Sequence, residues 1–477
     1  MELVIPLSKK GEPLFRQIYQ GMRQAILTSA LPAGSRLPST RELAEQLGVS
    51  RTVVLLAYDL LLAEGFAVGR GGSGTYVSES LGRSTPKKEK RAAAVRLSRY
   101  GAAAAGAMAA VDTPLPSSLP VRYDFTYGRS AIESFPLERW LRMLLRHARQ
   151  APVRAFEYGP AAGSRVLREA ICAHLRRSRG VVCDPSEVIV VNGSQQAIDL
   201  VVRVLVERGD RVAIEDPQYN GTREVLRAAG AKLVPVPVDS EGLNPADLPE
   251  QAGLVFVTPS HQFPTGAILP LARRLALLDW ARRKNSLIVE NDHDGEFHYG
   301  GRPLESMQGL DTDGRVVYLG TFSRTVFPAL RIGYLIVPKP LATAFIAAKW
   351  LNDLHSPTVE QETLAEFIDS GMYERHLRRL RRRNADHREA LLDAVHQYLG
   401  NRVAVTGDGS GAHIVLWPVK RVSESTIIAQ AASRGVAVHG ISHCYLKKPL
   451  RPGVIIGYSR MREEPIREGI RILSELL

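Results

Sequence analysis

Polar residues suited to holding a phosphate follow a short apolar run near the middle of the chain. Val190–Asp199 reads as the end of a buried strand, a Gly-Ser turn and the start of a helix. The first backbone N–H groups of a helix have no partner within the helix, so they and the Ser194 hydroxyl can donate to an anion. The segment therefore predicts a phosphate site, although this pattern alone is weakly specific.

A second polar set, within the first hundred residues, has the chemistry to bind DNA. Arg51 is expected to read a base, because one guanidinium can donate to O6 and N7 of guanine together. Hydroxyl groups and helix N-termini suit phosphate contacts. The alternative is that the serines only cap helices and the arginines are only solvated. The predicted set is Ser39, Thr40, Arg41, Ser50, Arg51, Thr52 and Arg70.

Helices must position these residues. An apolar residue recurs every four positions after Pro13, which predicts a first helix with the apolar face Leu14, Ile18, Met22 and Ile26. Ser39 and Glu42 form the capping box of a second helix. Ser50 is expected to cap a third helix, from Arg51 to about Ala63. The residues expected to face inward from it are Val54, Tyr58, Leu61 and Leu62.

The rest of the chain divides by composition. Phe66–Arg70 and Thr75–Val77, joined by a glycine-rich turn, predict a two-stranded wing, so residues 11–78 form a winged helix-turn-helix. Residues 79–120 lose helical periodicity and predict a flexible linker. Its features are the basic cluster Lys87–Arg91, the Ala/Gly tract Gly101–Ala110 and the Pro/Ser stretch Pro114–Pro120.

Residues 121–477 alternate short apolar runs with amphipathic stretches of helix length. This alternation is typical of buried strands in an α/β domain. The runs predicted to be strands include Val188–Val191, Leu254–Val257, Leu287–Glu290 and Val316–Leu319. The expected fold is therefore multidomain: an α+β winged helix followed by an α/β domain.

The N-terminal module closely resembles the winged-helix domain of the GntR superfamily. The resemblance covers nearly all of residues 11–78 and lies in Leu31–Ala44, Gly48–Thr52, Ala57–Leu61, Glu64–Gly65 and Gly72–Val77. It implies that the module binds double-stranded operator DNA.

Five segments of the large domain, in order, resemble the fold-type-I aminotransferase half of MocR regulators, a GntR subfamily. They are Val190–Asp199, Glu215–Tyr219, Thr258–Gly266, Glu290–Phe297 and Gly320–Gly333. In this subfamily the domain senses pyridoxal phosphate or its adducts. Carried over by position, Tyr219 stacks on the pyridine ring and Gln262 lies beside the ring substituents. The phosphate-holding set is Ser194, Gln195, Thr321, Ser323 and Arg331.

Three positions depart from the MocR pattern. Where the subfamily has the lysine that forms the Schiff base, this chain has Arg324, and a guanidinium is no imine-forming nucleophile. Asn291, 33 positions earlier, replaces the aspartate expected against the pyridine nitrogen, and His293 replaces the expected tyrosine. Asp292 is a candidate substitute, but adjacent strand positions point to opposite faces.

These departures leave the ligand open. Either the domain binds pyridoxal phosphate or a pre-formed adduct non-covalently, with Arg324 adding charge, or Asn291, His293 and Arg324 form a new polar set for another anionic or aromatic molecule. The remaining alternatives are a purely structural domain without a ligand and an engineered replacement of the lysine by Arg324.

A basic stretch, Tyr373–Arg383, contains seven arginine or histidine residues. It either contacts DNA or is a solvated helix face that packs against the rest of the protein, and the second interpretation is preferred.

Charge and cysteine content limit which partners and which cellular compartment the sequence favours. Lysine and arginine outnumber acidic residues by 62 to 49, and residues 1–100 hold 15 basic against 8 acidic side chains. This excess favours a polyanionic partner. The three cysteines show no metal-ligand or disulfide spacing. With no membrane-length apolar run, a cytoplasmic protein is expected.

The preferred function is a homodimeric DNA-binding transcription regulator that senses a small-molecule effector and is not an enzyme. The alternatives are a pyridoxal-phosphate-dependent aminotransferase with an accessory DNA-binding domain, and a nucleic-acid binder without sequence preference. Arg324 argues against the aminotransferase, because transamination normally proceeds through the lysine.

Overall fold

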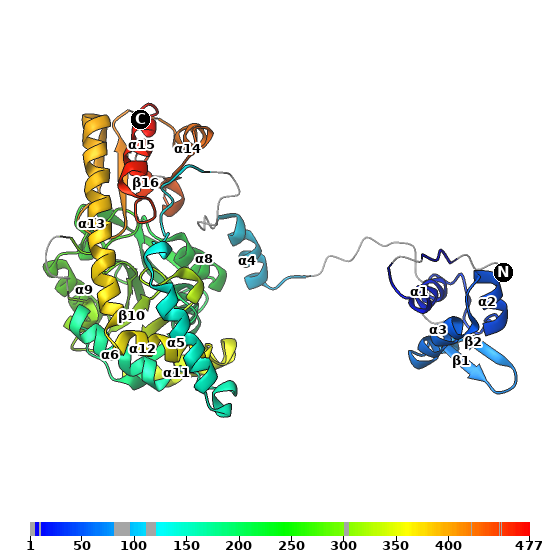
Figure 1. Cartoon of the computed structure of the whole chain (residues 1–477). Helices are drawn as coiled ribbons and strands as arrows, with labels where there is room; N and C mark the ends of the chain where they lie inside the picture. The colour runs from blue at the N-terminus through cyan, green and yellow to red at the C-terminus, as the bar shows by residue number, and fades with distance from the viewer. Residues whose placement is uncertain are drawn as a thin grey trace. The chain divides into compact units, whose positions relative to one another are not determined.

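The structure is a computed structural model, and it describes residues 5–8, 11–80, 96–110, 121–299, 305–420, 422–447, 449 and 451–477. The chain divides into two compact units, Met1–Arg96 and Leu97–Leu477 (Figure 1). Each unit has its own hydrophobic core. The basic cluster Lys87–Arg91 and the stretch Pro114–Pro120 lie outside the described residues.

The first unit is the predicted winged helix-turn-helix. Its helices are α1 (Leu14–Leu27), α2 (Thr40–Leu47) and α3 (Arg51–Ala63), and its wing pairs β1 (Ala67–Arg70) with β2 (Gly74–Val77) in antiparallel register. The apolar faces of the three helices meet in one core, because Ile18, Met22 and Ile26 of α1 are buried as their spacing predicts.

The capping predictions of this unit had different outcomes. Ser39 forms the expected box, accepting from the Glu42 backbone N–H at 3.2 Å while its own N–H donates to the Glu42 carboxylate at 2.8 Å. Ser50 occupies the N-cap of α3, but its side chain makes no cap bond. Leu62 was predicted to face inward and is 38% exposed. It follows the buried Leu61 by one position, which turns a side chain about 100° around a helix.

A large mixed sheet forms the centre of the second unit, with strand order β4-β11-β10-β9-β8-β5-β6-β7. The strands are parallel except β11, which is antiparallel to both β10 and β4, and the short β7. Their bounds are β4 (Val188–Val191), β5 (Arg211–Asp216), β6 (Lys232–Asp239), β7 (Gly242–Leu243), β8 (Leu254–Val257), β9 (Leu287–Asp292), β10 (Val316–Thr321) and β11 (Gly333–Ile336). The strand predictions are confirmed.

A smaller antiparallel sheet has the order β12-β13-β16-β15, and a separate parallel pair joins β3 to β14. The strands are β3 (Tyr123–Asp124), β12 (Val403–Thr406), β13 (His413–Pro418), β14 (Val436–Ala437), β15 (His439–Gly440) and β16 (Val454–Gly457). The N-terminal end of this unit therefore pairs with a segment more than 300 residues later in the chain.

Helices cover both sheets of this unit (Figure 1). They are α5 (Leu137–Gln150), α6 (Arg165–Arg179), α7 (Ser194–Leu205), α8 (Asn220–Ala229), α9 (Leu271–Lys284), α10 (Met307–Leu310), α11 (Lys339–Asp353), α12 (Thr358–Asp369), α13 (Met372–Tyr398), α14 (Glu424–Ser433) and α15 (Glu463–Leu473). The long α13 runs from α12 beside the large sheet to α15 at the smaller one, so it connects the two halves of the unit.

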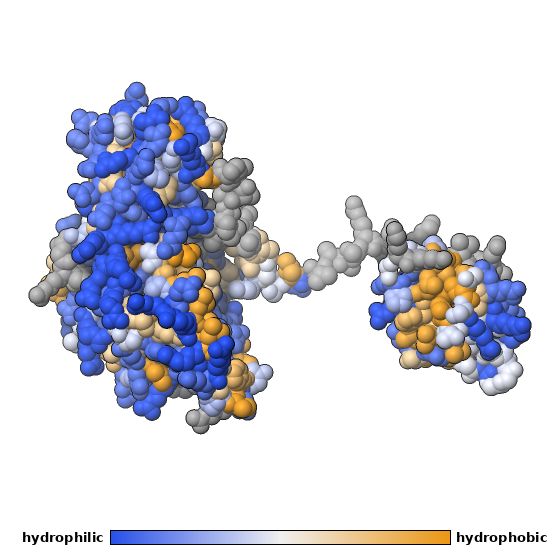
Figure 2. Space-filling view, viewed as in Figure 1, coloured by the Kyte–Doolittle hydropathy of each residue, from blue (hydrophilic) through white to orange (hydrophobic). Residues whose placement is uncertain are grey.

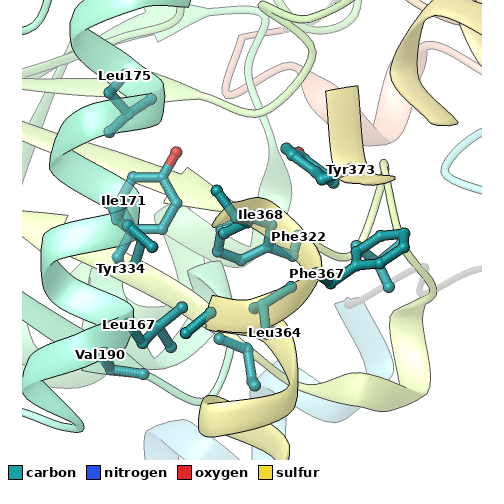
Figure 3. Packing of buried hydrophobic residues seen from close by; sticks show 14 of the residues in the cluster. Leu167, Ile171, Leu175, Val190, Phe322, Tyr334, Leu364, Phe367, Ile368 and Tyr373 are labelled. Atoms are coloured by element: carbon teal, nitrogen blue, oxygen red, sulfur yellow. The ribbon is translucent and has the colours of Figure 1, made fainter. Parts of the chain in front are cut away.

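One face of the large sheet is sealed by a dense apolar cluster (Figure 3). Leu167, Ile171 and Leu175 recur every four residues on α6 and meet Leu364, Phe367 and Ile368 of α12 over Val190 and Tyr334 of the sheet. Helical spacing thus places one apolar stripe of each helix on the strands. This packing fixes the strand ends from which the candidate site is built.

Part of the stretch assigned to a flexible linker is helical. α4 (Arg99–Ala110) lies against α8, and the Arg203 guanidinium lies 6.0 Å from the centre of the Tyr100 ring. The composition that suggested a linker is rich in alanine, which has the highest helix propensity.

The basic stretch on α13 has a buried and an exposed face. Tyr373, His376, Leu377 and Leu380 are buried, whereas Arg375, Arg378, Arg379 and Arg382 are exposed. Hydrophilic colour follows this helix in Figure 2. Among the described helices, none combines the length and apolarity that crossing a membrane requires.

Candidate functional site

The predicted ligand-binding residues gather where neighbouring strands of the large sheet end. Thr321 of β10 pairs with Gly333 of β11, which in turn pairs with Val191 of β4. Leu319 of β10 lies beside Asn291 of β9. Segments separated by more than 100 residues in the sequence are thereby brought to one edge of the sheet.

The phosphate motif has the expected local structure. Ser194 and Gln195 open α7, and the N-cap residue Gly193 has a φ of 84° and makes no side-chain cap bond. The Arg331 guanidinium lies beside this turn and donates to the Asn192 carbonyl at 2.7 Å. A Cβ on Gly193 would lie only 2.7 Å from Arg331 Nη2, so the glycine is what permits this approach.

Thr321 ends β10 and Ser323 lies on the loop that follows, and protein contacts hold that loop. The Ser323 N–H donates to Thr321 Oγ1 at 3.1 Å, and Ser130 Oγ donates to the Ser323 carbonyl at 2.7 Å. From α13, Tyr373 and His376 bond to the side chain and the backbone carbonyl of Thr325 at 2.9 and 2.8 Å. Ser130, Tyr373 and His376 were not predicted to belong to the site.

Tyr219 and Gln262 differ in what they leave available for a ligand. The Tyr219 hydroxyl donates to Gln195 Oε1 at 3.3 Å, and burial raises the pKa of Tyr219. The Gln262 amide donates to the Pro217 and Phe263 carbonyls at 2.7 Å and accepts from Thr265 Oγ1 at 2.7 Å. The Gln262 side chain therefore connects its own loop to the loop after β5.

Arg324 is paired with a buried carboxylate that the sequence analysis did not single out. Its Nε lies 2.9 Å from Asp294 Oδ1 and its Nη2 3.3 Å from Oδ2. Burial alone would raise the pKa of Asp294, but Arg324 beside it holds that pKa well below its usual range. Arg324 Nη1 is buried and has no hydrogen-bond partner. The guanidinium is thus fixed by Asp294 with one donor left over.

Asp292 and Asn291 are adjacent on β9 and point to opposite faces of the sheet. Asp292 accepts from Arg179 Nε at 2.7 Å and from the Tyr318 hydroxyl at 2.5 Å, on the face opposite to Asn291 and its neighbour Leu319. The expectation that Asp292 points to the other face is thereby met. Asn291 lies on β9 beside Leu319, half-buried.

Histidine rings surround the Asp294 carboxylate. His293 Nε2 lies 3.8 Å from Asp294 Oδ2 and has no hydrogen-bond partner. The His261 ring centre lies 4.7 Å from that of His413 and 6.2 Å from that of His293. Burial lowers the pKa of all three, that of His413 to about 4, so the rings are neutral at pH 7.

The predicted DNA-contacting residues are accessible on the first unit. Arg51, Arg41, Ser50, Thr52 and Arg70 are exposed. Arg51 Nε lies 3.2 Å from Thr40 Oγ1, which joins the starts of α3 and α2. On the wing, Arg70 bonds to Glu79 at 2.6 Å and stacks over the Tyr76 ring at 4.8 Å. The N-terminal end of α3 therefore presents donors to its surroundings.

Known protein families match both units. The family described as "Bacterial regulatory proteins, gntR family" matches residues 14–77, and "Aminotransferase class I and II" matches residues 125–470. Among solved structures, kynurenine aminotransferase of Pyrococcus horikoshii has a TM-score of 0.70 at 26% identity, covering 81% of this chain and 96% of that one. The α-aminoadipate aminotransferase LysN of Thermus thermophilus gives 0.71 at 27%, covering 78% and 96%.

Relatives that match along nearly the whole length are regulators. The probable rhizopine catabolism regulatory protein MocR of Rhizobium meliloti is 39% identical over 97% of this chain and 93% of its own length. The pyridoxine biosynthesis transcriptional regulator PdxR of Corynebacterium glutamicum is 31% identical over 96% and 95%. The chain therefore belongs to the GntR family of regulatory proteins and, within it, to the MocR kind of DNA-binding transcription regulator with an aminotransferase-like domain.

Proposed function

We propose that this regulator acts in the cytoplasm as a homodimer that binds paired operator half-sites, and that its aminotransferase-like domain holds a phosphate-bearing effector without a covalent bond. In this proposal Arg51 reads a base, Arg41 and Arg70 contact the DNA backbone or the minor groove, and Ser39, Thr40, Ser50 and Thr52 contact phosphates. The effector that fits best is pyridoxal phosphate or a pre-formed adduct of it with an amino compound.

The pairing of Arg324 with Asp294 carries the non-covalent part of this proposal. A guanidinium remains protonated and delocalised at working pH, so it does not condense with an aldehyde as a lysine amine does. The Arg324 side chain is also held by a carboxylate with no exposed surface. Its unpartnered Nη1 is a hydrogen-bond donor suited to an oxygen of a bound ligand.

The phosphate end of the cofactor fits the residues present. The N-terminus of α7 has no side-chain cap, which leaves its first N–H groups to donate to an anion. Arg331 lies next to the same turn, and Ser194, Thr321 and Ser323 add hydroxyl groups from the adjoining strand ends. These residues would bind and orient the phosphate.

The ring end fits less well. When bound, pyridoxal phosphate supplies an electron sink that depends on a protonated ring nitrogen, and the neutral amide of Asn291 cannot balance that charge. Asp292 is already paired with Arg179 and Tyr318. The residues therefore favour binding of pyridoxal phosphate over catalysis of transamination. The experiment must also distinguish pyridoxal phosphate from a different anionic or aromatic effector.

Aminotransferase activity is the second candidate, because the domain matches the aminotransferase family over residues 125–470. Arg324→Lys tests both candidates. Wild type and Arg324→Lys are incubated with pyridoxal phosphate, reduced with borohydride, denatured and weighed by mass spectrometry. We expect the cofactor mass to stay on Arg324→Lys, whereas wild type holds the cofactor only in native mass spectra.

Arg282→Lys, which adds a lysine on the exposed side of α9, controls for unspecific labelling. A wild type that keeps the cofactor after denaturation, or that exchanges amino groups between amino and keto acids, would overturn the non-covalent proposal. A wild type that binds no cofactor in native spectra would instead favour the different-effector alternative.

Exposed apolar side chains support the homodimer. Tyr158 is 85% exposed and Leu351, near the end of α11, is 77% exposed. Val153, Phe156 and Trp350 are also exposed, and residues 156–158 line the same cleft as His355 and Pro357. Figure 2 shows hydrophobic colour gathered over the lower part of the large unit, near α5. Surfaces of this kind usually mark protein interfaces.

A further inference from the structure

Three ligand-type side chains from distant parts of the chain converge in the interior of the large unit. His261 lies on the loop after β8, Asp294 follows β9, and His413 opens β13 of the smaller sheet. Each is 2% exposed, and one ligand atom from each lies within 4.8 Å of the other two. The cluster therefore joins the large sheet to the smaller one.

One hydrogen bond of His413 shows which ring nitrogen carries the proton and which has a free lone pair. His413 Nε2 lies 3.0 Å from the Pro264 carbonyl oxygen, which can only accept, so Nε2 carries the proton. In the neutral ring Nδ1 is then unprotonated. A histidine that donates one N–H to a backbone carbonyl and offers the other nitrogen is the arrangement that metal ligands show in proteins.

His261 has a buried nitrogen with no partner. Its Nδ1 lies 2.8 Å from Ser410 Oγ, whereas Nε2 has no hydrogen-bond partner. Whichever nitrogen holds the proton, Nε2 is left without a hydrogen bond, which is unfavourable for a buried polar atom. Gly411 leaves room beside it, because a Cβ there would lie 2.3 Å from Nε2.

We propose that His261, His413 and Asp294 bind one divalent transition-metal ion, such as Zn²⁺. Two imidazole nitrogens and one carboxylate oxygen are a ligand set that Zn²⁺ and its neighbours in the first transition row take, with a fourth position left for a non-protein ligand. The ligand atoms lie within 4.8 Å of one another, and bond lengths of about 2.1 Å require separations of roughly 3.4 Å, which small side-chain movements can supply.

Arg324 competes with such an ion for Asp294. The guanidinium Nε lies 2.9 Å from Oδ1, but Nη2 is 3.3 Å from Oδ2, so Oδ2 is held less strongly. A carboxylate oxygen has two lone pairs, so Asp294 can coordinate the ion while it still accepts a hydrogen bond from Arg324. Two positive charges at one buried carboxylate favour an anion in the fourth position. Binding of the metal ion should therefore strengthen binding of an anionic effector that contacts Arg324.

Metal binding is tested on the full-length, tag-free chain after chelator treatment. Zn²⁺ is added, unbound metal is removed, and bound Zn²⁺ is measured by elemental mass spectrometry. We expect one Zn²⁺ per wild-type chain. His261→Gln and His413→Gln should each weaken binding by roughly tenfold or more. His396→Gln, which changes an exposed histidine on α13, is the matched control and should bind as wild type does.

Arg324→Gln separates a metal site from a structural network. Removing the competing charge should tighten Zn²⁺ binding roughly tenfold, and Zn²⁺ should raise the Tm of this variant more than that of wild type. A purely structural cluster would show neither change. Co²⁺ in wild type gives an independent readout, because ligation by imidazole and carboxylate at four-coordination gives intense visible absorption that hydrated Co²⁺ lacks.

Three results would overturn the proposal: wild type that retains no Zn²⁺, histidine variants that bind Zn²⁺ as tightly as His396→Gln, or a Co²⁺ spectrum of the hydrated ion. None of these results bears on operator binding, which is measured separately on the same preparations. The metal proposal can therefore fail while operator binding is intact, and the reverse also holds.

Discussion

At the level of single residues, the ion pair formed by Arg324 and Asp294 is buried, so breaking it should lower stability. Asp294 has no exposed side-chain surface and Arg324 has 12%. Breaking a buried ion pair leaves one charge uncompensated, which costs about 3 to 5 kcal/mol. We expect Asp294→Asn to lower the free energy of unfolding by about that amount, measured by urea denaturation followed through tryptophan fluorescence.

The double variant Asp294→Asn/Arg324→Met supplies the comparison, since it leaves no unpaired charge. It should lose less stability than Asp294→Asn alone. Equal losses in the single and double variants would show that the two side chains are not energetically coupled.

Glu215 is a buried carboxyl group whose titration should be visible in stability. Burial raises its pKa to about 7, against the hydrogen bonds from Thr258 and Gln262 that lower it. The unfolded value is about 4.3. Because the folded pKa is the higher one, wild type loses stability as the pH rises from about 4.3 through about 7, by on the order of 3 kcal/mol in total. Glu215→Gln removes this loss.

The measurement is the free energy of unfolding of wild type and Glu215→Gln from pH 5 to pH 8. The difference between them should grow in favour of the variant as the pH rises. Glu250→Gln, at an exposed side chain, is the control. A difference that stays constant with pH would mean that Glu215 does not titrate in this range.

Residue types alone predicted part of the site. Arg324, Asn291 and His293 stood out because they replace the residue types expected of a cofactor site. Asp294, His261 and His413 did not, since their role depends on a contact with His413, which lies more than 100 positions after the other two. Gln262 was assigned to a ligand by resemblance, which stays a prediction, and the structure adds that its amide bonds to the Pro217 and Phe263 carbonyls.

At the level of elements, periodicity predicted the helices and strands that bury one regular face. The wing and the capping box at Ser39 follow from local residue types, and both are present. The helix α4 was missed because its Ala/Gly composition carries no apolar stripe, and its contact with α8 is a long-range one that the local sequence does not reveal. Short-range signals therefore predict elements well when burial reinforces them.

The start of α3 is the element on which operator recognition should depend. Arg51 is exposed there and lies 3.2 Å from Thr40 of α2. We expect Arg51→Ala to weaken operator binding by about 1 to 3 kcal/mol and to relax the preference for one base pair. Fluorescence anisotropy with the operator and with single-base variants of it measures both effects.

Arg16→Ala provides the matched control, because it removes an exposed arginine from α1. It should leave the base preference unchanged. Arg51→Ala could instead weaken binding equally for every sequence and reduce the slope of log K against log salt concentration by about one. Arg51 would then contact phosphate and not a base.

At the scale of the whole molecule, the order of motifs along the chain identified both units, while their internal geometry came only from the structure. Five ordered segments were enough to predict an aminotransferase-like domain. The pairing of β3 with β14, and the connection of the two sheets by α13, join segments that no local pattern relates. Long-range pairing of this kind is what a single sequence leaves undetermined.

The homodimer is the property of the whole molecule that one substitution can test. Leu351 is 77% exposed on α11 beside Trp350, so we expect its side chain to be buried against a second copy. Leu351→Glu places a charge in that apolar surface and should weaken dimerisation by roughly a hundredfold or more. Light scattering after size-exclusion chromatography measures the mass, and binding to paired half-sites should weaken in parallel.

Val419→Glu is the control, since Val419 is an exposed apolar side chain, 70% accessible, after β13 of the smaller sheet. That variant should keep the mass of the wild type. A Leu351→Glu protein that remains dimeric would place the interface elsewhere on the unit. A wild type that is monomeric at the concentrations where it binds paired half-sites would remove the homodimer from the proposed function, because each half-site would then be occupied independently.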